Sequence, residues 1–213
     1  AYGRAQAEIL LRTPWNARSE EWEPGPAADF AFGVPLPDWL VLQADGRLLV
    51  IPEPQHVRWI VMQADLRAAV QASDVIAYAS AGYVNEGAMG AWVTSNGGNG
   101  GNLVSREYWV GWAPTKGLLL RGGRLALPFG IRSEEHILFA RSATQTDTND
   151  DQQVGVDAVY GRGKTRGEVM AILGNFQVSP DQFRERGYSA AASYALTNSF
   201  ELGVSSLVAH ATL

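Results

Sequence analysis

The side chains able to do chemistry in this chain are charged groups that stand two positions apart, with apolar residues between them. Asp65 and Arg67 flank Leu66, and Arg166 and Glu168 have the same spacing. Successive side chains of a β-strand point to opposite faces, so this spacing places the charges on one face of a sheet. A row of charges on the inner face of a cylinder of strands could line a water-filled path for solutes or ions.

The predicted pore-lining residues are Arg4, Glu8, Asp65, Arg67, Glu107, Arg121, Arg124, Asp157, Arg166, Glu168 and Glu201. They carry both signs of charge. Either they form ion pairs that keep buried charges satisfied, or they form a selectivity ladder for charged solutes. Arg121 and Arg124 have opposite parity, so both can face inward only if the strand bulges near Gly122-Gly123. Otherwise one of the two arginines lies at the membrane interface.

Other chemistry finds little support. The three histidines, His56, His136 and His210, are far apart in the sequence, and the chain has no cysteine, so we expect no metal site. No nucleophile elbow or phosphate-binding loop occurs. We therefore expect neither an enzyme nor a cofactor. A net charge of -5 argues against a nucleic-acid partner. The acidic segment 132–151 is either a solvated outer loop or a loop folded into a pore.

Period-two alternation is the main structural signal. It predicts strands near residues 2–12, 58–71, 75–84, 103–113, 118–128, 152–161, 166–177, 187–196 and 200–210. No run of about 18 apolar residues is present, so no transmembrane helix is expected. Residues 13–57, rich in Pro and Trp, are expected to form a long loop or hairpin excursion, with a turn at Ala44-Asp45-Gly46.

The connections between these strands alternate in length. Short turns at 72–74, 114–117, 163–165 and 197–199 alternate with longer polar segments at 85–102, 129–151 and 178–186. Outer-membrane barrels have short turns at one end and long loops at the other. The fold prediction is an antiparallel transmembrane β-barrel in a single domain, 1–213, either closed or a partial wall of 9–10 strands from a larger barrel. The predicted membrane-interface aromatics are Tyr108, Trp112, Tyr160, Tyr188, Tyr194 and Phe200.

One stretch carries a resemblance. Residues 117–131, which run through Arg121-Gly122-Gly123-Arg124 to Pro128-Phe129-Gly130, resemble a strand-to-loop segment of the phosphate-selective porin group of outer-membrane porins. The preceding segment 107–114 resembles the strand-and-turn style of the same proteins. The resemblance implies a channel of about 14–18 strands, often trimeric, that takes up small solutes. The predicted strand number is smaller, and the chain ends His210-Ala211-Thr212-Leu213 without a terminal aromatic. Phosphate specificity is not carried over, since no matching lysine cluster is present.

The expected function is passive diffusion of small hydrophilic solutes or ions through a porin in a Gram-negative outer membrane. The expected partners are outer-membrane lipid and lipopolysaccharide, the solutes, and copies of the chain in a homotrimer. Because the chain begins at Ala1 without methionine, we expect that an export signal has been removed. Two alternatives stay open. One is a structural β-barrel sheath or anchor for a partner protein, and the other is a soluble β-sandwich binding module.

Overall fold

The described part of the protein consists of β-strands and their connections. The computed structural model describes residues 30–31, 34–35, 37, 39–83, 103–105, 107–130, 152–174, 186–197 and 200–210. These ranges contain no helix, so the predicted all-β class is confirmed. In particular, they contain no helix fit to span a membrane. The strands are β1 (Phe30–Ala31), β2 (Val34–Pro35), β3 (Leu40–Pro52), β4 (Val57–Ala72), β5 (Val75–Tyr83), β6 (Leu103–Val104), β7 (Tyr108–Thr115), β8 (Leu118–Leu125), β9 (Gln153–Arg162), β10 (Thr165–Gly174), β11 (Arg186–Ala195) and β12 (Glu201–His210).

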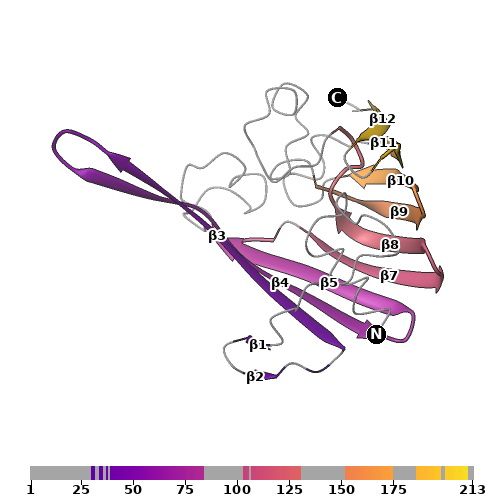
Figure 1. The fold of residues 1–213 in the computed structure, drawn as a ribbon, viewed down its shortest axis with the longest axis horizontal. Helices are drawn as coiled ribbons and strands as arrows, with labels where there is room; N and C mark the ends of the chain where they lie inside the picture. Colours follow the sequence, from indigo (N-terminus) through magenta and orange to yellow (C-terminus); the bar gives the residue numbers. More distant parts are fainter. Residues whose placement is uncertain are drawn as a thin grey trace.

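A single large antiparallel sheet contains ten of these strands (Figure 1). Its order is β12-β11-β10-β9-β8-β7-β5-β4-β3, with β6 added beside β5, while β1 and β2 pair with each other. The two edge strands β3 and β12 do not pair with each other, so the described strands do not close into the predicted barrel. The ten strands of this sheet agree in number with the 9–10 strands that were predicted.

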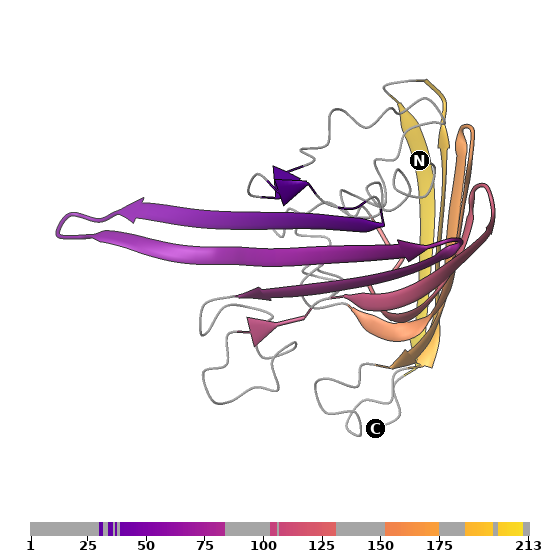
Figure 2. The same ribbon diagram turned by 90° about the horizontal axis from the view of Figure 1, so that it is seen from below.

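The sheet is curved (Figure 2), and its two faces differ in burial. Along β5 burial alternates without a break: Ile76, Tyr78 and Ser80 are buried, and the residues between them are exposed. We call the buried side the inner face and the opposite side the outer face. The exposed residues of β5 are Val75, Ala77, Ala79, Ala81 and Tyr83, all apolar or aromatic. The exposed face of β5 is therefore apolar, while its buried face carries both apolar and polar side chains.

Tight turns join the strands at one end of the sheet. Ser73-Asp74 joins β4 to β5, Lys116-Gly117 joins β7 to β8, and Gly163-Lys164 joins β9 to β10. Each turn has one residue with positive φ: Ser73 at 55°, Gly117 at 85° and Gly163 at 57°. Two-residue hairpin turns need this backbone conformation, because it matches the twist of the flanking strands. The predicted short turns at these three places are confirmed.

Replacing Gly117 with alanine is expected to lower stability by about 1–3 kcal/mol, because the backbone there disfavours any side chain. Its φ is positive, and a Cβ atom would lie 2.3 Å from the carbonyl oxygen of Gly161. The control is Gly161→Ala, where an added Cβ would meet no atom within 4 Å. Urea unfolding followed by tryptophan fluorescence should show a lower midpoint for Gly117→Ala alone. Equal midpoints for the two variants would show that the turn is not constrained.

The hairpin of β3 and β4 projects beyond the rest of the sheet (Figure 1). Residues 64–72 of β4 pair with β5, whereas its first residues pair with β3 alone. The predicted turn at Ala44-Asp45-Gly46 is wrong, because these residues lie inside β3 and pair with β4. Gly46, for example, is the register partner of Ala64. The turn is at 53–56, where the Glu53 amide donates to the His56 carbonyl oxygen at 2.9 Å.

Most other strands lie within three residues of their predicted bounds. Two predictions need correction: the strand predicted at 103–113 is two strands, β6 and β7, and the strand predicted at 118–128 ends at Leu125. The strand predicted at 2–12 lies outside the described residues.

Candidate functional site

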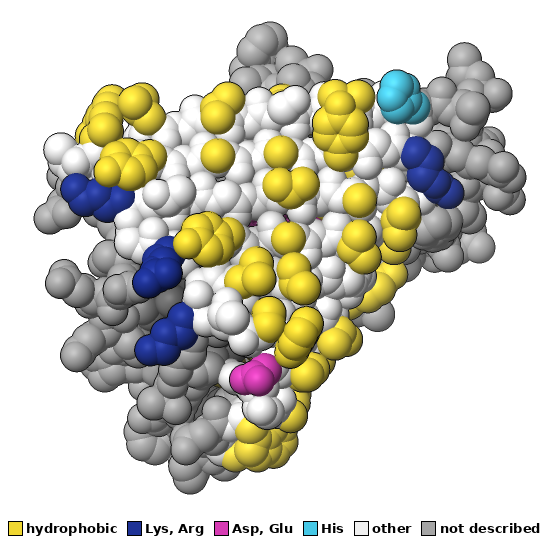
Figure 3. Space-filling model, turned by 90° about the vertical axis from the view of Figure 1, so that its right-hand side faces the viewer, with side chains coloured by type: hydrophobic (Ala, Val, Ile, Leu, Met, Phe, Trp, Pro, Cys, Tyr) yellow, Lys and Arg dark blue, Asp and Glu magenta, His cyan; other side chains and the backbone are white. Residues whose placement is uncertain are grey.

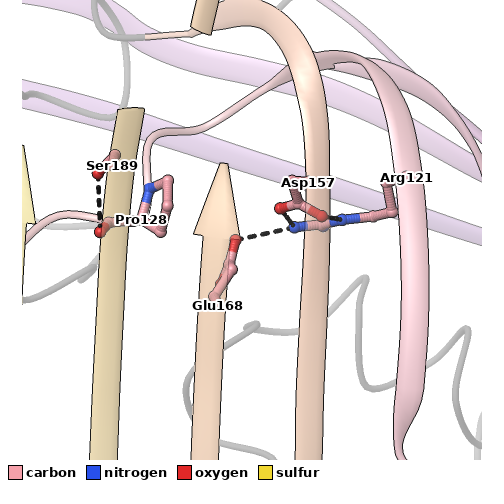
Figure 4. A network of polar contacts seen from close by, with 5 residues as sticks. All are labelled: Arg121, Pro128, Asp157, Glu168 and Ser189. Carbon is pink, nitrogen blue, oxygen red and sulfur yellow. Dashed lines mark hydrogen bonds and ion pairs between the residues drawn. The ribbon is translucent and has the colours of Figure 1, made fainter. Parts of the chain in front are cut away.

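A row of charged side chains crosses the middle of the inner face. Arg121 on β8 is the register partner of Asp157 on β9, and Glu168 lies on the next strand, β10. The Arg121 Nε donates to Asp157 Oδ1 at 3.0 Å, and its Nη2 donates to Asp157 Oδ2 at 2.5 Å and to Glu168 Oε1 at 2.9 Å (Figure 4). All three residues are buried, with Glu168 only 3% exposed. One guanidinium thus bridges two carboxylates on two neighbouring strands.

Aromatic rings continue this row on its other side. The Trp109 ring on β7 stacks on Tyr78 of β5, with centroids 5.3 Å apart and planes inclined by 26°. The Arg121 guanidinium lies 5.3 Å from the Trp109 ring centroid. The ring face attracts a cation, and Arg121 is therefore held between a π-system and two carboxylates. Five side chains from five strands form one band, which we call the inner band: Tyr78, Trp109, Arg121, Asp157 and Glu168.

The other predicted pore-lining residues, Arg124 apart, divide into four groups. Asp65 is buried, and its Oδ2 lies 3.8 Å from Nη2 of Arg67 on the same face. Glu107 and Arg166 are half-buried. Glu201, at the start of the edge strand β12, is exposed, and the structure does not bring it into the inner band. Arg4 and Glu8 lie outside the described residues. Sequence parity thus put Asp157 and Glu168 of the inner band on the polar face of their strands, and left open whether Arg121 or Arg124 faces the same way.

Arg121 and Arg124 are both buried despite their opposite parity. Of the two alternatives for these arginines, the bulge at Gly122-Gly123 is not found, because β8 pairs with β7 through this point without a shift of register. The shift lies instead between Trp112 and Thr115. Gly123 has a φ of 148°, and a Cβ there would lie 2.2 Å from the Tyr108 carbonyl oxygen. The alternation of burial ends beyond this glycine, since Arg124 and Leu125 are both fully buried. Neither arginine lies at an exposed rim.

The chain leaves β8 and runs across the inner face in a segment that we call the strap, residues 126–130. The Ser189 hydroxyl on β11 donates to the Pro128 carbonyl oxygen at 3.0 Å (Figure 4). The Gly130 amide donates to the Ser205 hydroxyl on β12 at 2.9 Å. Since β9 and β10 lie between β8 and β11, the strap passes over both. The sequence did not predict this path. The segment 132–151, for which an inward loop was one of two expectations, lies outside the described residues.

The outer face carries apolar side chains without a cover among the described residues (Figure 3). Val169 is 58% exposed and Val204 is 72% exposed. All six predicted interface aromatics lie exposed: Tyr108, Trp112, Tyr160, Tyr188, Tyr194 and Phe200. Trp112, Tyr160 and Tyr194 lie toward the short turns, while Tyr188 lies near the other end of β11. Aromatic side chains thus stand on both sides of a band of Val and Ala.

The inner band is a buried network of ion pairs and stacked rings. In the described ranges no group of three or more His, Asp or Glu side chains could hold a metal ion. The polar side chains of the inner band are engaged with one another, and the described outer face offers mainly apolar groups. Comparison with known proteins adds no further guide: no protein-family model, curated protein or solved structure gives a significant match to this chain.

Proposed function

We propose that this chain forms the wall of a porin-type β-barrel in a Gram-negative outer membrane and lets small hydrophilic solutes or ions diffuse passively. The observation that carries the proposal is the inverted sheet. Arg121, Asp157 and Glu168 are buried on the inner face, while Val169 and Val204 are exposed on the outer face. This is the distribution that lipid outside and a polar interior inside would require.

The energetics of the outer face support lipid as its surroundings. Burial of apolar surface contributes about 25 cal/mol per Å². In water, the exposed apolar side chains of the outer face would not gain this stabilisation. The side chains that are more than half exposed include Val110, Val156, Val169, Leu202 and Val204. An exposed apolar surface that spans several strands is typical of a surface in contact with lipid or with another protein.

Strand length and connection length also support the proposal. Strands β7 to β12 are 8 to 10 residues long, close to the ~9–11 residues of a tilted strand that crosses a bilayer. The two-residue turns lie at one end of the sheet, and the chain spends many more residues between β5 and β7, β8 and β9, and β10 and β11 at the other end. The resemblance of residues 117–131 to outer-membrane porins agrees with this arrangement.

Planar-bilayer recording tests the proposal. The purified chain, folded in detergent micelles and added to a lipid bilayer, should produce stepwise increases of current that heat-denatured protein does not produce. A protein that remains monodisperse in plain buffer and leaves the bilayer silent would contradict the proposal. That result would favour a soluble β-sandwich module.

A structural sheath or anchor is the second candidate, and one observation favours it. The inner face also holds a buried apolar cluster that includes Ile76, Leu119, Leu125, Met170 and Ile172. A water-filled lumen is lined mainly by polar groups, whereas a filled barrel can accommodate such a cluster. A chain that co-floats with lipid vesicles, yet passes no current, would support the sheath over the channel.

A further inference from the structure

Three basic residues stand together at the short-turn end of the sheet. Lys116 lies in the β7–β8 turn, Arg162 ends β9, and Lys164 lies in the β9–β10 turn; all three are exposed. Residues 115–117 and 161–165 contain no Asp or Glu. The chain as a whole carries a net charge of -5, so this positively charged group is opposite in sign to the net charge of the chain. Figure 3 shows Lys and Arg side chains along this end of the outer face. We call the three residues the basic rim.

Backbone hydrogen bonds hold the basic rim in place. The Gly161 amide donates to the Gly117 carbonyl oxygen at 2.7 Å, which fastens the end of β9 to the β7–β8 turn. A Cβ added to Gly117 would lie 3.8 Å from the Cβ of Arg162, so the residue that follows Lys116 lies close to Arg162. On the other side, the Ala195 amide donates to the Lys164 carbonyl oxygen at 2.9 Å. The three cations therefore stand on backbone segments that hydrogen bonds to neighbouring strands hold in place.

Aromatic side chains lie one step further along the same strands. Tyr160 precedes Arg162 by two residues and shares its face, and Trp112 and Tyr194 stand at the same end of β7 and β11. Aromatic rings favour the depth of lipid headgroups in a membrane. A cation just beyond such a ring reaches the depth of the lipid phosphates. The turn between β4 and β5 carries Asp74 instead, which limits the basic rim on that side.

We propose that the basic rim binds the phosphate groups of anionic phospholipids in the leaflet that meets the short turns. The proposal rests on the proposed membrane function. Charge complementarity selects the partner: three cations on two bonded turns fit anionic headgroups, and the aromatic rings beside them fit the adjacent acyl boundary. Each Lys or Arg near an anionic membrane surface adds to the attraction, which salt screens.

The test compares two lipids in the same vesicles. The chain is inserted into phosphatidylcholine vesicles that contain a fifth of phosphatidylglycerol, with one lipid or the other brominated, and quenching of tryptophan fluorescence reports which lipid is adjacent. The parent should prefer phosphatidylglycerol by roughly tenfold over phosphatidylcholine, and 1 M salt should remove the preference. The triple variant Lys116→Gln, Arg162→Gln, Lys164→Gln should show no preference.

Two controls make the outcome decisive. The double variant Arg58→Gln, Arg186→Gln removes cations that lie away from the short turns, and should keep the preference of the parent. Inorganic phosphate added in solution should not compete, because the proposal commits to a lipid surface. A triple variant with the parent's preference overturns this proposal and leaves the proposed function intact. A parent that fails to insert into either kind of vesicle overturns both.

Discussion

Arg121→Met is expected to lower the free energy of unfolding by about 3–5 kcal/mol, because it leaves two buried carboxylates without their cation. The Arg121 guanidinium donates two hydrogen bonds to Asp157 and one to Glu168. Without it, the two acidic groups face each other on adjacent strands in a buried place. The measurement is the urea midpoint of vesicle-inserted protein, followed by tryptophan fluorescence.

Replacing the two carboxylates with neutral amides tests whether unpaired charge causes the loss of stability in Arg121→Met. Combining Arg121→Met with Asp157→Asn and Glu168→Gln should recover much of the loss, because neutral amides cost less to bury than unpaired charges. Arg58→Met is the matched control, since Arg58 is exposed on the projecting hairpin, and should change stability by less than about 0.5 kcal/mol. A triple variant as unstable as Arg121→Met would show that the loss comes from packing around Trp109.

Val169→Arg is expected to cost about 2–4 kcal/mol in a lipid bilayer, because position 169 lies at the middle of an outer row of β10. The same residue is 58% exposed, so in a water-soluble sheet the substitution should cost no more than about 0.5 kcal/mol. The measurement is again urea unfolding from vesicles. This single position therefore distinguishes lipid from water on the outer face.

Thr165→Arg provides the depth control on the same strand and the same face. Thr165 begins β10 beside the short turn, where a charge should cost about 0–1 kcal/mol because the interface is close. Equal costs at 165 and 169 would contradict a membrane-spanning β10. A similar small cost at both positions would indicate water, and a similar large cost would indicate a protein partner over the whole row.

The strands were largely predictable because alternation is a local property of the sequence. In β5, β10 and β11 every second residue is apolar or small, and the pattern fixes which face each side chain joins. The failures came from interactions between distant segments. Asp45-Gly46 is a strong local turn signal, yet pairing with β4 keeps both residues extended. The strap also escaped prediction, since hydrogen bonds to Ser189 and Ser205 determine its path.

The sequence indicated which face of the sheet carries the candidate site, but not which of its side chains contact one another. Parity placed Asp157 and Glu168 on one side of their strands, but only the register of β8, β9 and β10 brings Arg121 between them. Trp109 and Tyr78 were not predicted as site residues. The parity of Trp109, opposite to that of Tyr108 on the same strand, was the signal that could have indicated an inner role for Trp109. Which ring stacks on which depends on the pairing of β5 with β7, and this pairing joins segments about 30 residues apart.

The unpaired margins of the sheet set a requirement on any membrane form of this protein. No other described strand covers the far side of β3 or β12, so alternate amide and carbonyl groups along Leu40–Pro52 and Glu201–His210 lack strand partners within the described sheet. In hydrocarbon each unsatisfied backbone group costs several kcal/mol. A sheet surrounded by hydrocarbon must therefore have no unpaired edge. Insertion requires a further strand paired with each edge strand, from this polypeptide or from another. Closure of the sheet should therefore precede or accompany its entry into the bilayer.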